Sequence, residues 1–265
     1  MSASTSDPDS PDPLDEARSL IASARALLEE LGEEDAFQLE RAPSSDAAPV
    51  RAQRAAEPPA SAPAPASAPE IRPTFAEPGP RPTLEEVRAR LGDCRRCGLC
   101  EGRNTIVFGD GRPDADLLFI GEGPGEQEDL RGLPFVGRAG ELLTQMIEKG
   151  IGIPRRDVYI CNIVKCRPPQ NRNPLPPEVS ACRPFLDDQI RAVAPRVIVT
   201  LGKPAASLLL GRDIAITRVR GTWQEYQGIP LMPTLHPAYV LRQYTPENRR
   251  AVWEDLKAAY ERSRA

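Results

Sequence analysis

The segment ADLLFIGEG, residues 115–123, indicates the fold class. Its apolar run has the length of one strand and no polar interruption, which is typical of a strand buried on both faces of a parallel sheet. It runs directly into a glycine-rich turn, and the next periodic segment, 137–150, has a helical pattern that ends at a glycine. A strand, a turn and a helix in this order predict one α/β unit.

The same alternation continues along the rest of the chain. Further strands are predicted at 158–164, 196–202 and 231–237. Further helices are predicted at 176–193, from Lys203 to Leu210, and from Pro246 onward with Thr245 as the N-cap. The sequence therefore predicts four strands in a mainly parallel sheet with helices on both faces. Ligands of such sheets bind beyond the carboxyl ends of the strands.

The first 80 residues differ in composition from the remainder. They hold 13 of the 30 prolines, 15 acidic residues, six arginines and no lysine, a net charge of −9, whereas residues 81–265 carry a net charge of +5. Such a segment cannot bury a core, so we expect a disordered tail at 1–80 and one domain at 81–265. Apolar residues on one helical stripe at 14–32 predict either a transient helix or a helix that docks an unknown protein partner.

Neither membrane insertion nor secretion is indicated. No run approaches 18 apolar residues, and the acidic N-terminus lacks the basic and apolar regions of a secretory signal. We therefore expect the chain in a reducing cytoplasm, where clustered cysteines are metal ligands or catalytic thiols more often than disulfides.

The motif CRRCGLC, residues 94–100, contains three of the six cysteines. Cys94 and Cys97 form a CxxC, and Cys166 and Cys182 are each followed by Arg-Pro, a shared context that marks them as a pair. One CxxC with two widely spaced cysteines fits an iron–sulfur cluster better than zinc, whose sites usually join two closely spaced pairs. Zinc and unligated thiols remain the alternatives.

The other two cysteines fit the set less well. Cys161 lies inside a predicted strand, as a core residue would, and Cys100 could replace one member of the quartet. The arginines that follow Cys166 and Cys182 could offset the negative charge of a cluster.

The turn GEGPGEQED, residues 121–129, is the first candidate ligand site. Its spacing differs from the GxGxxG dinucleotide fingerprint, and three acidic residues follow where a phosphate-binding loop would have none. Backbone N–H groups that face a small neutral ligand are therefore favoured over a phosphate cradle. Phe135, in the next glycine-rich loop, belongs either to the core or to the wall of a pocket.

Three polar side chains complete the candidates. Asn162 ends the second predicted strand, and its amide could recognise the edge of a base, with an Asx turn as the alternative. Asn171 lies in a proline-rich loop, where turn formation is the default. His236, the only histidine, follows the last predicted strand, where a functional role competes with a structural one.

Together, GEGPGEQED, PFVGRAG, NIVKCRPPQNRNP, ACRPFL and HPAYVLR resemble the motifs of the family 4 uracil-DNA glycosylases, the branch that carries a 4Fe–4S cluster. The resemblance covers about residues 88–262. It implies a three-layer α/β/α sandwich with a four-stranded, mainly parallel sheet. It also implies a DNA repair enzyme that flips uracil out of DNA and hydrolyses its N-glycosidic bond, leaving an abasic site. We expect a monomer that acts on uracil-containing DNA in the cytoplasm, at the nucleoid.

The resemblance also implies roles for individual residues. The cluster ligands would be Cys94, Cys97, Cys166 and Cys182, with Cys100 and Cys161 unused. Glu122 and Gly123 would contact uracil through their backbone, Phe135 would stack on the flipped base, and Asn162 would bind the uracil edge and reject cytosine.

For catalysis, the resemblance places His236 near uracil O2, and Glu128 and Asn171 on the sugar and water side of the pocket. In a wider branch of the superfamily an aspartate activates water at the position of Gly123. The base is therefore unassigned here, and Glu128 or a water ordered by Asn171 are the candidates.

Two other classes of protein remain open at this point. One is an iron–sulfur electron carrier, and the other is a zinc-bound nucleic-acid-binding module without catalysis. Visible absorption, metal analysis and a nicking assay on a uracil oligonucleotide distinguish the three.

Overall fold

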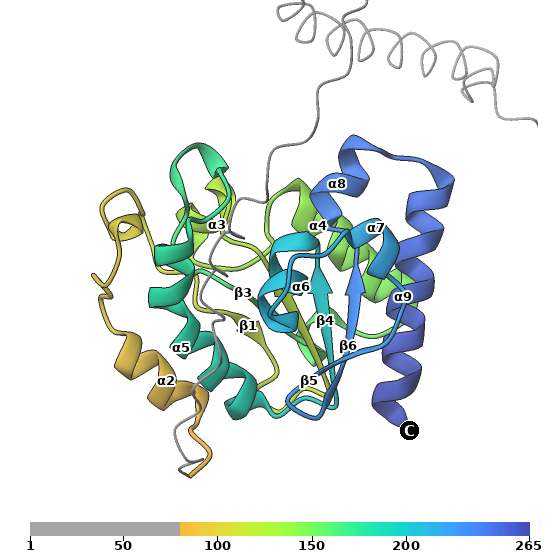
Figure 1. Cartoon of the computed structure of the whole chain (residues 1–265), viewed down its shortest axis with the longest axis horizontal. Helices are drawn as coiled ribbons and strands as arrows, with labels where there is room; N and C mark the ends of the chain where they lie inside the picture. Colours follow the sequence, from red (N-terminus) through yellow and green to blue (C-terminus); the bar gives the residue numbers. More distant parts are fainter. Residues whose placement is uncertain (1–79) are drawn as a thin grey trace, which may run out of the picture. The chain divides into compact units, whose positions relative to one another are not determined.

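The computed structural model describes residues 80–265, which form a sheet with helices on both faces (Figure 1). This arrangement confirms the predicted α/β class, while the helix predicted at 14–32 lies outside the described residues. The strands are β1 (Asp110–Gly111), β2 (Leu117–Gly121), β3 (Tyr159–Asn162), β4 (Val197–Leu201), β5 (Gln224–Tyr226) and β6 (Ile229–Thr234). Their order in the sheet is β1-β3-β2-β4-β6-β5.

The number of strands differs from the expectation. The central four, β3, β2, β4 and β6, are parallel and correspond to the four predicted runs. The sheet nevertheless has six strands, because β1 and β5 add an antiparallel strand at each edge. β5 joins β6 through Gln227 and Gly228, both with positive φ, as two-residue hairpin turns require. Strands of two and three residues leave no apolar periodicity to detect.

The eight α-helices in residues 80–265 are α2 (Leu84–Leu91), α3 (Glu126–Arg131), α4 (Arg138–Gln145), α5 (Pro176–Val193), α6 (Lys203–Leu210), α7 (Ile216–Val219), α8 (Pro237–Arg242) and α9 (Pro246–Arg264). Four of them, α4, α5, α6 and α9, correspond to predicted helices. α5 and α6 have the predicted bounds, and α9 is capped as predicted by Thr245. The segment predicted at 137–150 is α4 followed by a π-helical turn, η2 (Met146–Ile151). None of these helices is long and apolar enough to cross a bilayer.

Alternate residues of β2 face opposite helical layers. Leu118 and Ile120 belong to the core that α5 and α6 complete, whereas Leu117 and Phe119 pack in the core that contains α4 and α9. Each of the four side chains is at most 3% exposed. Burial on both faces is the physical reason for the uninterrupted apolar run of this strand.

The carboxyl ends of the parallel strands meet at one edge of the sheet. Gly121 pairs with Asn162, and Leu201 pairs with Thr234, so the segments that follow these strands begin side by side. Two helices that the sequence did not predict, α3 and α8, lie in these segments. They shape the entrance and the walls of the space above the sheet.

Candidate active site

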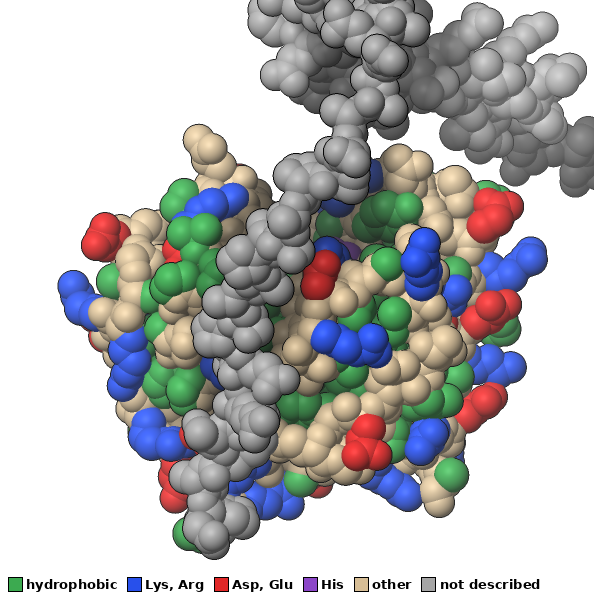
Figure 2. Space-filling model, in the orientation of Figure 1, with side chains coloured by type: hydrophobic (Ala, Val, Ile, Leu, Met, Phe, Trp, Pro, Cys, Tyr) green, Lys and Arg blue, Asp and Glu red, His purple; other side chains and the backbone are tan. Residues whose placement is uncertain are grey.

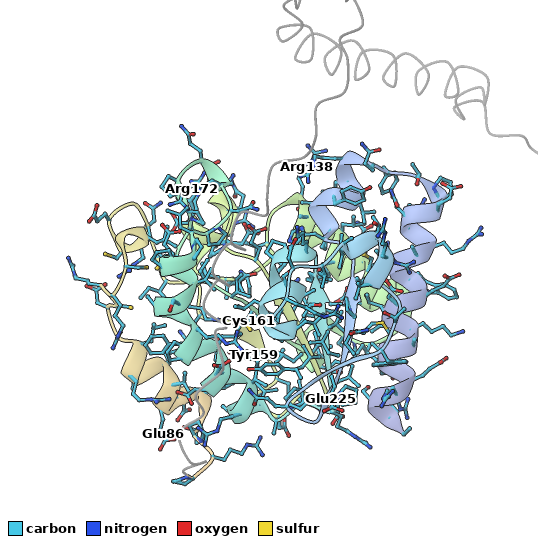
Figure 3. All side chains as sticks on the ribbon, in the orientation of Figure 1. Glu86, Arg138, Tyr159, Cys161, Arg172 and Glu225 are labelled. Atoms are coloured by element: carbon cyan, nitrogen blue, oxygen red, sulfur yellow. The ribbon has the colours of Figure 1, made fainter. Side chains whose placement is uncertain are left out.

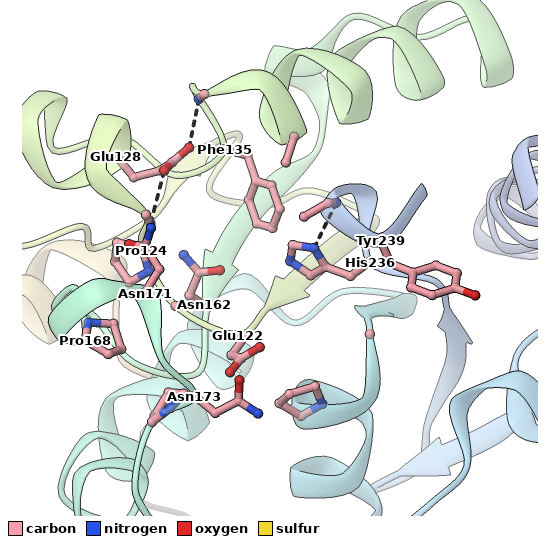
Figure 4. A pocket seen from close by; sticks show the side chains of 18 of the residues that line it. Glu122, Pro124, Glu128, Phe135, Asn162, Pro168, Asn171, Asn173, His236 and Tyr239 are labelled. Atoms are coloured by element: carbon pink, nitrogen blue, oxygen red, sulfur yellow. Dashed lines mark hydrogen bonds between the residues drawn. The ribbon is translucent and has the colours of Figure 1, made fainter. Parts of the chain in front are cut away.

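A cavity of about 660 Å³ opens above the carboxyl ends of the parallel strands (Figure 4). The segments after β2, β3, β4 and β6 all contribute to its lining. The lining includes all seven residues that the sequence placed in a pocket, namely Glu122, Gly123, Glu128, Phe135, Asn162, Asn171 and His236. The structure therefore brings together residues that are up to 114 positions apart in the chain.

Asn162 forms the floor of the cavity. Its side chain is 1% exposed, and within the described part of the chain its Oδ1 has no hydrogen-bond partner. A buried amide oxygen without a partner is costly, so this atom is poised to accept from a ligand. Gly121 keeps the site compact, because a Cβ there would collide with both the Asn162 amide and the Phe135 ring.

Phe135 and His236 form one wall of the cavity, and in Figure 4 their rings point toward the same space as the Asn162 amide. Their ring centroids are 5.7 Å apart. Phe135 has a φ of 52°, which is uncommon for a residue with a side chain. Position 140 must be glycine to leave room for this backbone, because a Cβ on residue 140 would collide with the Phe135 carbonyl. Strain of this kind is tolerated where the surrounding structure fixes the residue.

His236 is a neutral hydrogen-bond donor in this geometry. It is the N-cap of α8, and its Nδ1 accepts from the Ala238 N–H at 3.1 Å. Burial, together with the positive charge of Arg242, lowers the pKa of His236 to about 4, although Glu128 acts in the opposite direction. Since Nδ1 is an acceptor, the single proton of the neutral ring lies on Nε2.

Glu128 is held by three backbone N–H groups. Its Oε1 accepts from Val136 and Gly137 at 2.8 Å each, and its Oε2 accepts from Gly125 at 3.1 Å. This carboxylate therefore ties the turn after β2 to the loop that carries Phe135. Both of its oxygens are therefore committed to holding the backbone of these two segments.

Glu122 and Asn171 also line the cavity. Burial raises the pKa of Glu122, and its Oε1 has no hydrogen-bond partner among the described residues. Asn171 has a φ of 55°, and its Oδ1 accepts from Arg167 Nε at 2.8 Å. The sequence assigned only a backbone role to Glu122, because desolvation of a side chain is not visible in a motif.

The lining of the cavity includes four cationic side chains, Arg138, Arg172, Lys203 and Arg242. Figure 3 shows Arg138 and Arg172 at the same end of the molecule, far from Glu225 at the other end. On the face seen in Figure 2, basic and acidic side chains are interspersed, without one continuous basic patch. Arg172 pairs with Glu178 and Lys203 pairs with Asp213, so part of the positive charge near the opening is balanced.

A second, smaller cavity gathers the cysteines. Its lining contains Cys94, Cys97, Cys166 and Cys182, the quartet predicted from the sequence, and also Cys100. Cys161 is fully buried in β3 and does not line this cavity, as a core residue would not.

The arginines near the thiols are not those that the sequence suggested. Arg183 donates to Asp187 and Tyr226, and Arg167 donates to Asn171, so the residues that follow Cys166 and Cys182 turn elsewhere. Instead, Arg96 donates to Cys94 Sγ at 3.2 Å, and Arg103 donates to Cys166 Sγ at 3.4 Å. The prediction that the arginines after Cys166 and Cys182 offset the cluster charge is therefore wrong, because adjacent side chains point in different directions.

The chemistry of the cavity suits a metal cluster with thiolate ligands. Burial raises the pKa of Cys166 to about 11 and also raises the pKa of Cys182, so these thiols need a bound cation to lose their protons at neutral pH. No group of three or more His, Cys, Asp or Glu side chains in residues 80–265 has the geometry of a ready-made metal-ion site. The cysteines fit a cluster because they line one cavity and supply thiol donors.

Comparison with known proteins agrees with the site. The family model described as uracil DNA glycosylase superfamily matches residues 108–257. The type-4 uracil-DNA glycosylase of Thermotoga maritima is 48% identical over 178 residues, which cover 66% of this chain and 92% of the relative. That of Sulfurisphaera tokodaii is 44% identical over 183 residues, covering 66% and 82%. The type-5 uracil-DNA glycosylase of Pyrobaculum aerophilum is 34% identical over 192 residues, covering 60% and 84%. The chain therefore belongs to the uracil-DNA glycosylase superfamily, in its type-4 family.

Proposed function

We propose that this chain flips uracil out of DNA and hydrolyses its N-glycosidic bond, leaving an abasic site for base excision repair. One observation carries the proposal: a single cavity joins a buried amide, a pocket aromatic ring and a neutral imidazole donor. A base inside a duplex cannot be reached, and extrusion costs a few kcal/mol. Stacking on Phe135 would recover about 1–3 kcal/mol of this cost.

Asn162 would select the base. Its buried amide can accept from uracil N3–H through Oδ1, the atom without a partner, and donate to uracil O4 through Nδ2. Cytosine carries an acceptor at N3 and a donor at N4, so both contacts would be mismatched. Unpaired polar groups in a buried site disfavour the wrong base strongly.

His236 would stabilise the leaving group. Cleavage of the glycosidic bond leaves negative charge on uracil, and the Nε2–H of the neutral ring would donate to O2 as this charge develops. Removing a donor of this kind typically costs about 10²–10³ in rate. The hydrogen bond from Ala238 to Nδ1 would keep the required tautomer in place.

The water side of the pocket would involve three residues. We assign Glu128 to holding the loop of Phe135 in place, since its oxygens accept three backbone N–H groups. Asn171 would order the attacking water through Nδ2, because Arg167 occupies its Oδ1. Glu122, with a raised pKa and an oxygen without a partner, becomes a further candidate to receive the proton of the water.

Cys94, Cys97, Cys166 and Cys182 would hold a 4Fe–4S cluster. When bound, the cluster would supply a structural cross-link between the segment before β2, the loop after β3 and helix α5. Arg96 and Arg103 would offset part of its negative charge. Cys100 lines the same cavity and is the spare thiol. Iron analysis distinguishes this assignment from a zinc site.

DNA would approach the end of the molecule where Arg138 and Arg172 lie. Phosphate attraction should be modest, because the net charge of residues 81–265 is only +5, and binding should weaken with salt. Acting on genomic DNA would place the chain in the cytoplasm at the nucleoid. A monomeric state, a separate tail at 1–80 and its docking to a partner stay predictions.

The test is excision by the full-length chain from matched oligonucleotides that contain one uracil, one thymine or one cytosine. We expect abasic sites only with uracil, and the variant Glu225→Gln, at the far end of the molecule, should match the wild type. An iron-containing protein that leaves uracil in place would instead favour an electron carrier. A colourless protein that contains zinc and lacks excision would favour a nucleic-acid-binding module.

A further inference from the structure

Lys165 is a buried cation that the proposed reaction leaves unexplained. Its side chain is 1% exposed, and its Nζ donates to the backbone carbonyl of Asn162 at 2.6 Å. Among the residues that the structure describes, no carboxylate forms an ion pair with this ammonium group. A buried ammonium group without a counter-charge is strongly unfavourable, so a source of negative charge nearby would stabilise it.

The same residue belongs to the lining of the cysteine cavity. Lys165 shares this lining with Cys166 and Cys182, two of the proposed cluster ligands. Its own carbonyl accepts from the Val107 N–H at 2.9 Å, which fixes the backbone between β3 and Cys166. Lys165 therefore contacts both Asn162, at the end of β3, and the proposed cluster site.

The other cations at the thiols are less dependent on a cluster. Arg103 forms an ion pair with Asp93, which balances its charge within the protein. Arg96 donates to the carbonyls of Leu91 and Arg90 and belongs to the exposed side of the cavity. Lys165 is the cation of this group that is both fully buried and without an acidic partner in residues 80–265.

We propose that Lys165 is a positioning residue that couples the cysteine cavity to the base-reading amide of Asn162. Four thiolates give the cluster a net negative charge, which compensates the ammonium group, and the ammonium group in turn fixes the Asn162 carbonyl at the end of β3. This inference rests on the cluster and on uracil excision as proposed above. It gives the cluster an influence on base recognition without any contact with DNA.

The experiment compares the full-length wild type with Lys165→Met, Lys165→Arg and Lys257→Met. Lys257 is an exposed lysine of α9 and serves as the matched control. Each protein is studied with its cluster and after removal of iron by a chelator, and the apparent melting temperature of both forms is measured. Iron content and visible absorption report the loading of each sample.

If Lys165 couples the two sites, the effect of its replacement on the melting temperature should depend on the presence of the cluster. Lys165→Met should lower the melting temperature of the loaded form by about 4 °C or more, and should leave the stripped form unchanged or more stable, because it removes an uncompensated charge. Lys165→Arg should resemble the wild type, because it keeps the charge. Equal destabilisation of both forms by Lys165→Met would show a purely structural role and overturn the proposal. If Lys165→Met is insoluble, Lys165→Gln undergoes the same comparison.

Excision supplies a second readout. In loaded Lys165→Met the single-turnover rate on uracil should fall by about tenfold or more, the effect expected when a charged donor no longer holds the Asn162 carbonyl. The dissociation constant for DNA should stay unchanged, since Lys165 is buried. A wild-type rate in this variant would refute the link to Asn162. A wild type without excision would refute the proposed function itself, and an iron-free wild type would refute the cluster assignment; both results are visible before any variant is compared.

Discussion

The protonation state of His236 makes a quantitative prediction. With a pKa of about 4 instead of the usual 6.5, less than about 1% of this imidazole is charged at pH 6.5, whereas half would be charged in a group of ordinary pKa. The excision rate should therefore show no inflection from His236 between about pH 5.5 and 8. His236→Ala should lower the rate by about 10²–10³ across the whole range, because the donor to uracil O2 is lost.

The same shift predicts how stability changes with pH. The folded pKa lies below the unfolded value, so the unfolded chain binds more protons between these values and folding is favoured above pH 6.5. The contribution of His236 to the free energy of unfolding is lost as the pH falls from 6.5 toward 4. A difference of about 2.5 pKa units corresponds to at most about 3 kcal/mol. Protonation would also remove the acceptor that binds the Ala238 N–H.

The assay is single-turnover excision of uracil in buffers from pH 5 to 8.5, with chemical denaturation at each pH. An inflection near pH 6.5 that disappears in His236→Ala would refute the neutral donor. An acid limb that persists in His236→Ala and disappears in Glu122→Gln belongs instead to Glu122, whose pKa burial raises. The two titrations are thereby separated.

Three further predictions concern the base, the cluster and the tail. Asn162→Asp should lower the rate of uracil excision by about 10²-fold or more, because a carboxylate repels O4. Phe135→Ala should slow excision by roughly 5- to 150-fold without changing which base is excised. Both variants are measured on uracil and cytosine oligonucleotides under single-turnover conditions. Cys166→Ala should lose iron and visible colour whereas Cys161→Ala keeps them, and a fully coloured Cys166→Ala protein would contradict the ligand set. Deletion of residues 1–80 should leave turnover on a short oligonucleotide nearly unchanged, and a tenfold fall would assign the tail to the catalytic unit.

The features of this protein that depend on local periodicity could be predicted from the sequence. The apolar run at 115–123 required burial on both faces, and the bounds of α5 and α6 followed from their pattern. Contiguous motifs also carried the family resemblance, which the comparisons confirm, and they placed Asn162 and His236 at strand ends. These features are encoded within a few neighbouring residues, so they are legible without the fold.

The interactions of individual side chains, in contrast, became visible with the three-dimensional structure. Arg103 reaches Cys166 across 63 positions of the chain, while the arginine beside that cysteine turns to Asn171. The occupied oxygens of Glu128 and the neutral state of His236 likewise depend on backbone groups and burial supplied by other elements. Hydrogen bonding and desolvation act through space, and a linear motif records neither distance nor dielectric surroundings.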